Sequence, residues 1–116
     1  MMNKAVEVDM TFEDDPSETI RLIAVIDEHG DLTSEQVYGY ARDHAEEALV
    51  TYPFVLDRQS NDHYQIQWGY GDCTQSALNF SSPAVLLGQR VLRTDIYRHD
   101  SAQFAYEIVG IRDLVR

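Results

Sequence analysis

The chain has 116 residues, 44% apolar side chains and a net charge of −11, from 20 acidic against 9 basic side chains. Such a length and apolar content are typical of one folded domain, so we expect a single domain over residues 1–116. No apolar run approaches the ~20 residues of a membrane-spanning helix, and the first residues lack the pattern of a secretory signal. One cysteine cannot form an internal disulfide, which favours a cytoplasmic location, in a bacterium or in a host cell.

The negative charge is distributed unevenly. Residues 1–50 carry 13 acidic and 3 basic side chains, a balance of −10, whereas residues 51–116 carry 7 and 6, a balance of −1. A negative surface repels phosphates, which disfavours nucleic acid and anionic membrane as direct partners. The asymmetry favours a protein partner with a basic surface. Acidity for solubility or salt adaptation predicts charge spread evenly instead.

The N-terminal part predicts an antiparallel hairpin. Residues 5–13 alternate between apolar and polar side chains, the pattern of a half-buried strand. Residues 19–27 form a second strand with apolar residues on both faces, as in a central strand. Between them Pro16 marks a turn, because proline cannot continue a strand ladder. Residues 27–31 then form a polar loop.

An amphipathic helix is predicted over about residues 34–51. Thr33 and Gln36 have the spacing of a capping box, and Pro53 is placed to end the helix. Gly39 is unfavourable inside a helix, and its presence has two explanations: close approach by another backbone, or a glycine that is simply tolerated there. Apolar residues recur at helical spacing, namely Val37, Tyr40, Ala41, Ala45, Ala48 and Leu49.

The second half predicts strands. Residues 64–70 alternate with one strongly aromatic face, residues 76–80 form a short strand, and residues 89–98 and 103–112 form a final hairpin. The predicted order is β-β-α-β-β-β-β-β. This order predicts an α+β fold, in which one helix packs on a face of a mainly antiparallel sheet.

The sequence assigns no catalytic residue, metal ligand or cofactor. Cys73 follows Asp72, whose negative charge disfavours the reactive thiolate. The loop over residues 27–31 combines carboxylates with His29 but does not have the spacing of a calcium loop. His44 lies on the apolar stripe of the predicted helix, where histidine is usually a structural residue.

The leading hypothesis is a non-enzymatic, acidic protein-binding module or inhibitor that covers a basic surface of its partner, such as a surface that holds nucleic acid. DNA-mimicking phage proteins, including anti-CRISPR and anti-restriction proteins, and immunity proteins share this size and charge. Carrying like charges close together costs stability, and a basic partner would relieve that cost. The predicted partner-binding residues are Glu7, Asp9, Glu13, Asp14, Asp15, Asp27, Glu28, Asp31, Glu35, Asp43, Glu46 and Glu47.

Two other hypotheses belong to different classes. One is a small accessory subunit that binds through the aromatic strand, with Trp68 and Tyr70, or through a sheet edge. The other is an enzyme that uses Cys73 with a histidine. A homodimer is compatible with any of these readings.

Overall fold

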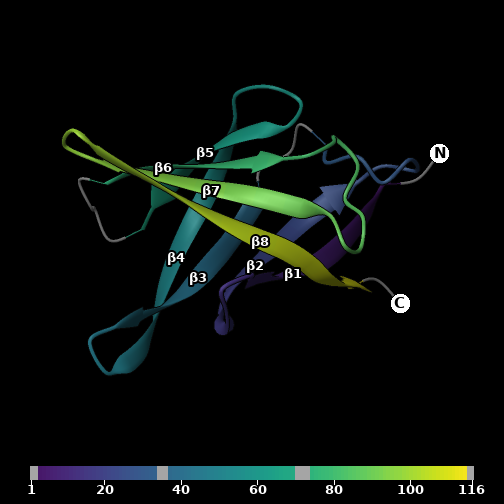
Figure 1. Ribbon diagram of the computed structural model, residues 1–116. Helices are drawn as coiled ribbons and strands as arrows, with labels where there is room; N and C mark the ends of the chain where they lie inside the picture. The colour runs from purple at the N-terminus through teal and green to yellow at the C-terminus, as the bar shows by residue number, and fades with distance from the viewer. Residues whose placement is uncertain (1–2, 34–36, 70–73, 115–116) are drawn as a thin grey trace.

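The computed structural model describes residues 3–33, 37–69 and 74–114 and forms a closed barrel of eight strands (Figure 1). Each strand pairs antiparallel with the next, and β8 pairs with β1 to close the sheet. The strands are β1 (Lys4–Phe12), β2 (Asp15–Ile26), β3 (Val37–Ala45), β4 (Ala48–Arg58), β5 (His63–Trp68), β6 (Gln75–Phe80), β7 (Arg90–Tyr97) and β8 (Asp100–Asp113).

The predicted α+β fold is therefore wrong, because the described residues form only strands and turns. The expected helix is a hairpin: β3 and β4 pair from Val37–Leu56 to Ala45–Ala48, around a turn at residues 46–47. No helix within the described ranges is long and apolar enough to span a membrane. Residues 34–36, which include the Gln36 of the proposed capping box, lie outside the described residues.

The helix prediction failed because a spacing of four residues fits both a helix and a strand. Val37 and Ala41 are buried together on the inner face of β3, as they would be on one face of a helix. Gly39, midway between them, also faces the core side chains of Leu22 and Phe54, whereas in a helix it would lie on the opposite face.

The turn that reverses the chain also gave no signal. Glu46 has a φ of 60°, a left-handed conformation that costs a non-glycine residue ~1–2 kcal/mol. Asn-Gly or Asp-Gly usually marks such a two-residue hairpin turn, and neither occurs at residues 46–47. Pro53, predicted to end the helix, lies inside β4. The pairing of β4 with β5 ends at Phe54 and Trp68, and the carbonyl of Pro53 accepts the N–H of Gly69 just beyond that pair. Proline has no N–H to donate, and at the end of the ladder this costs no hydrogen bond within it.

The inner face of the barrel is filled by apolar side chains. Alternate residues of every strand point inward, and an eight-stranded barrel is just wide enough for side chains to fill it. The buried apolar residues are Val6, Val8, Met10, Ile20, Leu22, Ala24, Ile26, Leu32, Val37, Ala41, Phe54, Leu56, Tyr64, Ile66, Leu78, Phe80, Val85, Val91, Tyr106 and Ile108.

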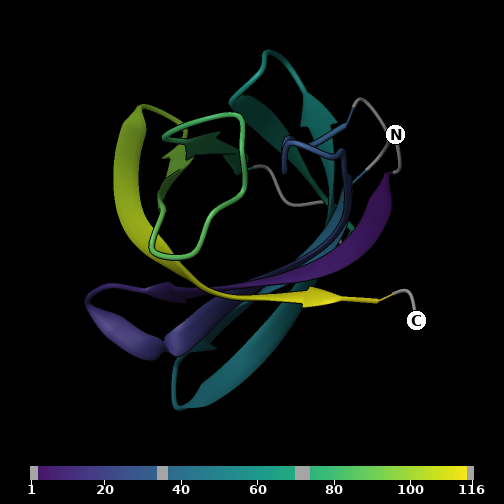
Figure 2. The same cartoon turned by 90° about the vertical axis from the view of Figure 1, so that its right-hand side faces the viewer.

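One end of the barrel is closed by two connecting segments, which face the viewer in Figure 2. The segment over residues 27–33 pairs with the segment over residues 81–89 through Asp31 and Ala84. Leu32 and Val85, from these two segments, are 5% and 4% exposed and belong to the core. The buried amide of Gln89 donates to the carbonyl of Ser82 and accepts the N–H of Leu86, which fixes the second segment in place.

Gly39 is predicted to tolerate no side chain. A β-carbon there would overlap the carbonyl oxygen of Arg21 and lie 3.0 Å from side-chain atoms of Leu22 and Phe54. We expect Gly39→Ala to lower the free energy of unfolding by about 1–3 kcal/mol, as overpacking does. The matched control is Gly110→Ala in β8, whose β-carbon would make ordinary contacts at 3.5 Å and 3.6 Å with Asp9. Equal losses in urea denaturation of the two variants would contradict this account.

Candidate functional site

In the described part of the chain, the other end of the barrel is open and hollowed. Two adjoining hollows of about 210 Å³ and 390 Å³ lie there and share Asp43, His44, Arg93 and Asp95. We call them together the mouth. The smaller hollow adds Glu18, Phe104 and Tyr106, and the larger adds Tyr52, Trp68 and Thr74.

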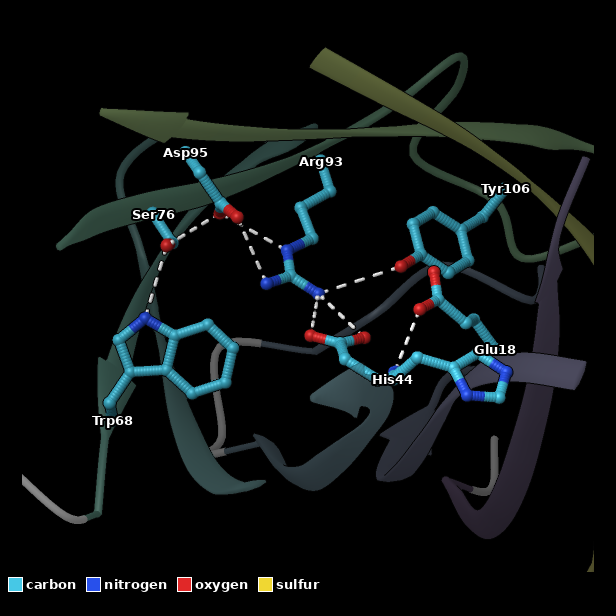
Figure 3. A network of polar contacts seen from close by, with 8 residues as sticks. Glu18, His44, Trp68, Ser76, Arg93, Asp95 and Tyr106 are labelled. Carbon is cyan, nitrogen blue, oxygen red and sulfur yellow. Dashed lines mark hydrogen bonds and ion pairs between the residues drawn. The ribbon is translucent and has the colours of Figure 1, made fainter. Parts of the chain in front are cut away.

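Arg93 is the centre of the mouth (Figure 3). Its side chain is 9% exposed, and its guanidinium binds two carboxylates. Nη1 lies 3.0 Å from Oδ2 of Asp43, while Nη2 lies 2.9 Å from Oδ2 of Asp95 and Nε donates to Oδ1 of Asp95 at 3.1 Å. Every nitrogen of the guanidinium therefore has an anionic partner, as a buried cation requires.

The pair between Arg93 and Asp43 crosses the barrel. Arg93 lies on β7 and Asp43 on β3, strands that stand four places apart in a ring of eight. Arg93 points inward because it follows the buried Val91 by two residues along β7. The charged pair therefore links opposite walls just above the apolar core.

Aromatic rings surround this guanidinium. Its central carbon lies 5.2 Å from the ring centroid of Trp68 and 5.8 Å from that of Phe104, within the range of a cation–π contact. The indole N–H of Trp68 donates to Ser76, and the Ser76 hydroxyl donates to Asp95 at 2.7 Å. The position of the indole is thereby tied to the same carboxylate that holds Arg93.

The electrostatics of the mouth are dominated by crowded carboxylates. Glu18, Asp43 and Asp95 face one guanidinium. Burial raises the pKa of Asp43, and the negative charges of Glu18 and Asp95 add to that effect, while Arg93 opposes it.

The pKa values of Arg93 and Tyr106 are shifted by the same buried and charged surroundings. Burial acts to lower the pKa of Arg93, but its bond to Asp95 and the charges of both aspartates raise it overall, so Arg93 stays charged. Burial raises the pKa of Tyr106 to about 12 despite the nearby guanidinium. Tyr106 is therefore a neutral hydroxyl at physiological pH.

The rim beside the mouth gathers Asp15, Ser17, Glu18 and His44. The set includes Ser, His and Asp, but its geometry is not that of a nucleophilic triad. Ser17 and Asp15 both approach the same ring nitrogen, Nε2 of His44, at 2.8 Å and 3.6 Å, and the hydroxyl of Ser17 donates to Asp15. In a triad the carboxylate holds the opposite nitrogen, so that the serine proton can pass to the ring.

The same rim residues could hold a divalent metal ion. One ligand atom each from Asp15, Glu18 and His44 lies within 4.8 Å of the others. Each of these side chains already has a protein partner, since Glu18 accepts the backbone N–H of His44 and Asp15 accepts Ser17. Among residues 3–33, 37–69 and 74–114, nothing beyond this cluster points to a bound ion.

The structure separates the acidic residues that the sequence grouped together. On the outer face of β1, Glu7 and Asp9 are matched by Arg112 at 3.0 Å and Arg21 at 2.6 Å. Glu13 forms a two-pronged pair with Arg90. These three acids are therefore balanced within the chain.

Three more acids lie at the closed end. Asp27 accepts the backbone N–H groups of His29 and Asp31, so its carboxylate holds the loop in shape. Glu28 lies 3.7 Å from His29. This loop is consequently distant in the fold from the turns at the mouth.

The remaining predicted acids lie at the open end or outside the described residues. Asp14 and Asp15 lie at the β1–β2 turn, and Glu46 and Glu47 form the β3–β4 turn. Asp43 points into the mouth, as described above, and Glu35 is not among the described residues. The first-half charge is thus divided among two ends and one outer face, and binding by these residues remains a prediction.

The residues of the accessory-subunit and cysteine-enzyme hypotheses lie partly within and partly outside the described ranges. Tyr64 and Ile66 of the aromatic strand are buried in the core, while Trp68 is half-buried in the mouth. Each described strand has two neighbours, but the pairing is not complete along every strand, since residues 100–104 of β8 pair with β7 alone. Tyr70 and Cys73 lie outside the described residues.

A separate hollow of about 320 Å³ lies outside the lumen, across β5, β6 and β7. It is lined mainly by uncharged amide, hydroxyl and aliphatic side chains, with His63 hydrogen-bonded to Asn79. The mouth, in contrast, combines a buried cation, carboxylates and aromatic rings, and it is the stronger candidate site.

Sequence reasoning missed Arg93, Asp95 and Glu18. A signal was present for the first of these, because Arg93 occupies an inward position of a strand whose previous inward residue is Val91. A charged residue on the apolar face of a predicted strand indicates a buried partner. That partner, Asp43, could not be identified because it is 50 residues away in the chain.

Loss of Arg93 is predicted to be strongly destabilising. Arg93→Met keeps most of the side-chain volume but leaves Asp43 and Asp95 without their cation, so we expect the free energy of unfolding to fall by about 3–5 kcal/mol. The matched control, Arg90→Met, removes the pair with Glu13 from the same strand, where the arginine is 63% exposed. Thermal and urea denaturation should show a much smaller loss for the control, and similar losses would exclude a special role for the buried pair.

The pKa values of the Asp43 and Asp15 carboxyl groups are predicted to be shifted in opposite directions from the ordinary value. The pKa of Asp43 lies above its ordinary value because of burial, whereas hydrogen bonds from Ser17 lower that of Asp15. Because the pKa of Asp43 is higher in the folded than in the unfolded state, its ionisation lowers the free energy of unfolding as the pH rises through these two pKa values. At a pH below the pKa of the unfolded state the carboxyl group is protonated in both states, and this cost is absent. Carbon-13 NMR titration measures both midpoints, and a midpoint of Asp43 below that of Asp15 would contradict the described surroundings.

No family model, no curated protein and no solved structure matches this chain. The inhibitor and anti-CRISPR interpretations, which rested on size and charge, gain no support from these comparisons. A function has to be inferred from the chemistry of the mouth.

Proposed function

We propose that this protein is a non-catalytic binding protein whose open mouth accepts a positively charged group of its partner. The observation that carries the proposal is the charge of the mouth, where Glu18, Asp43 and Asp95 face the single guanidinium of Arg93. Burial is the main cause of the raised pKa of Asp43, and the negative charges of Glu18 and Asp95 add to it. A second cation placed among these carboxylates would relieve their mutual repulsion.

The positions of the other acidic residues also favour the open end of the barrel as the site that attracts a cation. The outer acids of β1 are balanced by Arg21 and Arg112. At the open end, the turns of the two hairpins add residues 14 and 46–47, all three of which are acidic. Charged groups around a recessed site raise the local concentration of an oppositely charged ligand and speed its association.

A binding role fits the geometry better than catalysis does. Asp43 and Asp95 are held by Arg93 and Ser76, and Glu18 by the backbone N–H of His44. The rim residues Ser17 and His44 lack the relay that activates a nucleophile. A barrel of eight strands with one end covered and the other hollowed is suited to holding one small group. A basic side chain of a protein partner, as the sequence predicts, would supply such a group.

The test uses the only tryptophan of the chain, Trp68, which lines the mouth. We expect millimolar ethanolamine, choline and agmatine to change its fluorescence, and the apparent affinities to weaken as salt rises from 20 mM to 500 mM. Neutral and anionic molecules of similar size should leave the emission unchanged. An equal response to a neutral molecule, or no response to any cation, would overturn the proposal.

A pair of charge-removing variants locates the effect. Glu18→Gln takes one negative charge from the mouth and keeps an oxygen that can accept the N–H of His44, so we expect cation affinity to fall about tenfold. Glu13→Gln removes an equal charge from the exposed pair with Arg90 and should leave affinity within twofold. Equal losses in the two variants would indicate a general surface effect.

A further inference from the structure

We propose that the cation accepted by the mouth is an N-methylated ammonium group, such as trimethylammonium, in preference to a primary amine or a guanidinium. This inference rests on the proposed function and specifies the ligand class of the same site. It follows from two features of the mouth: the oxygens of Asp43 and Asp95 are already hydrogen-bonded, and the walls are aromatic.

The two aspartates of the mouth offer negative charge, while each of their oxygens already accepts a hydrogen bond. Both oxygens of Asp43 accept Nη1 of Arg93, at 3.0 Å and 3.3 Å. Asp95 accepts Nε and Nη2 of Arg93 and the hydroxyl of Ser76. Glu18 accepts the N–H of His44 at 2.8 Å.

A primary amine would have to compete with these bonds. It carries three N–H donors, each of which loses water on entering the mouth and needs a new acceptor. Leaving a donor unpaired, or displacing Arg93 from its aspartates, costs free energy. A trimethylammonium group has no N–H donor, so it can use the negative charge without disturbing the bonds of Arg93.

The aromatic walls fit the same group. Trp68 and Tyr52 line the larger hollow, with their ring centroids 6.3 Å apart and their planes at 80°. Phe104 and Tyr106 line the smaller one. Arg93 already lies against two of these rings, which shows that a cation is accommodated beside them. Aromatic rings with nearby carboxylates are the usual surroundings of quaternary ammonium ligands.

The size of the larger hollow suits a small cationic group. At about 390 Å³ the larger hollow lies near the lower end of the range for small-molecule sites, ~300–1,000 Å³. A free small molecule and a methylated lysine side chain both present the same trimethylammonium chemistry. Both are therefore included in the test.

The experiment compares three molecules of matched shape by the fluorescence of Trp68 and by calorimetry. Choline carries the trimethylammonium group, ethanolamine is its unmethylated counterpart, and 3,3-dimethyl-1-butanol is its neutral counterpart. We expect choline to bind at least tenfold more tightly than ethanolamine, and the neutral alcohol not to bind. Trimethyllysine amide, titrated in parallel with lysine amide, should show the same preference, and its affinity relative to choline identifies the source.

The outcomes separate this inference from the proposed function. If ethanolamine binds as tightly as choline, the preference for methylation is wrong and the cation-binding function stands. If the alcohol binds as tightly as choline, or if no cation binds, both fail.

Variants of the aromatic wall provide the second measurement. We expect Trp68→Phe to weaken choline binding severalfold and Trp68→Leu to abolish it, measured by calorimetry because the reporter is lost. The matched control is Tyr97→Leu, which removes an aromatic ring stacked with Arg98 on the β7–β8 hairpin, outside the mouth. Circular dichroism establishes that each variant is folded. Unchanged choline affinity in folded Trp68→Leu would overturn the inference, and so would an equal loss in the control.

Discussion

The pairing of β8 with β1 is the constraint on which the rest of the structure depends. It closes the sheet, so each described strand has two hydrogen-bonded neighbours and one face that points inward. Closure satisfies the backbone groups that an edge strand would expose. It also places every inward side chain in a shared interior, where a charged residue needs a partner that comes from another strand.

The two ends of this interior differ in chemistry. Toward the closed end it is apolar and covered by Leu32 and Val85, whereas toward the open end Arg93 and its two aspartates take the place of aliphatic side chains. Buried ion pairs of this kind are rarely the most stabilising choice, because desolvation offsets much of the attraction. Retaining one beside a hollow with aromatic walls is more readily understood as part of a binding site than as a means of stabilising the barrel.

The acidic character of the first fifty residues takes on a more specific meaning in the barrel. Part of it is matched by arginines, such as Arg21 and Arg112 on the outer face of β1. Part of it stabilises a loop through Asp27. Other acidic residues of the first half lie near the mouth, where Asp95 from the second half adds to their negative charge. Comparing the net charge of residues 1–50 with that of residues 51–116 does not reveal this contribution of Asp95.

The sequence by itself determined most of the strands, because alternation along β1, β2, β5, β6, β7 and β8 is a local property of the chain. It did not determine β3 and β4, since Val37 and Ala41 satisfy helical and strand spacing equally and the turn at Glu46 lacks a glycine. Only the tertiary structure decided the site. Arg93 and Asp43 are 50 residues apart, and they face each other because the closed sheet places β7 and β3 on opposite walls of one interior.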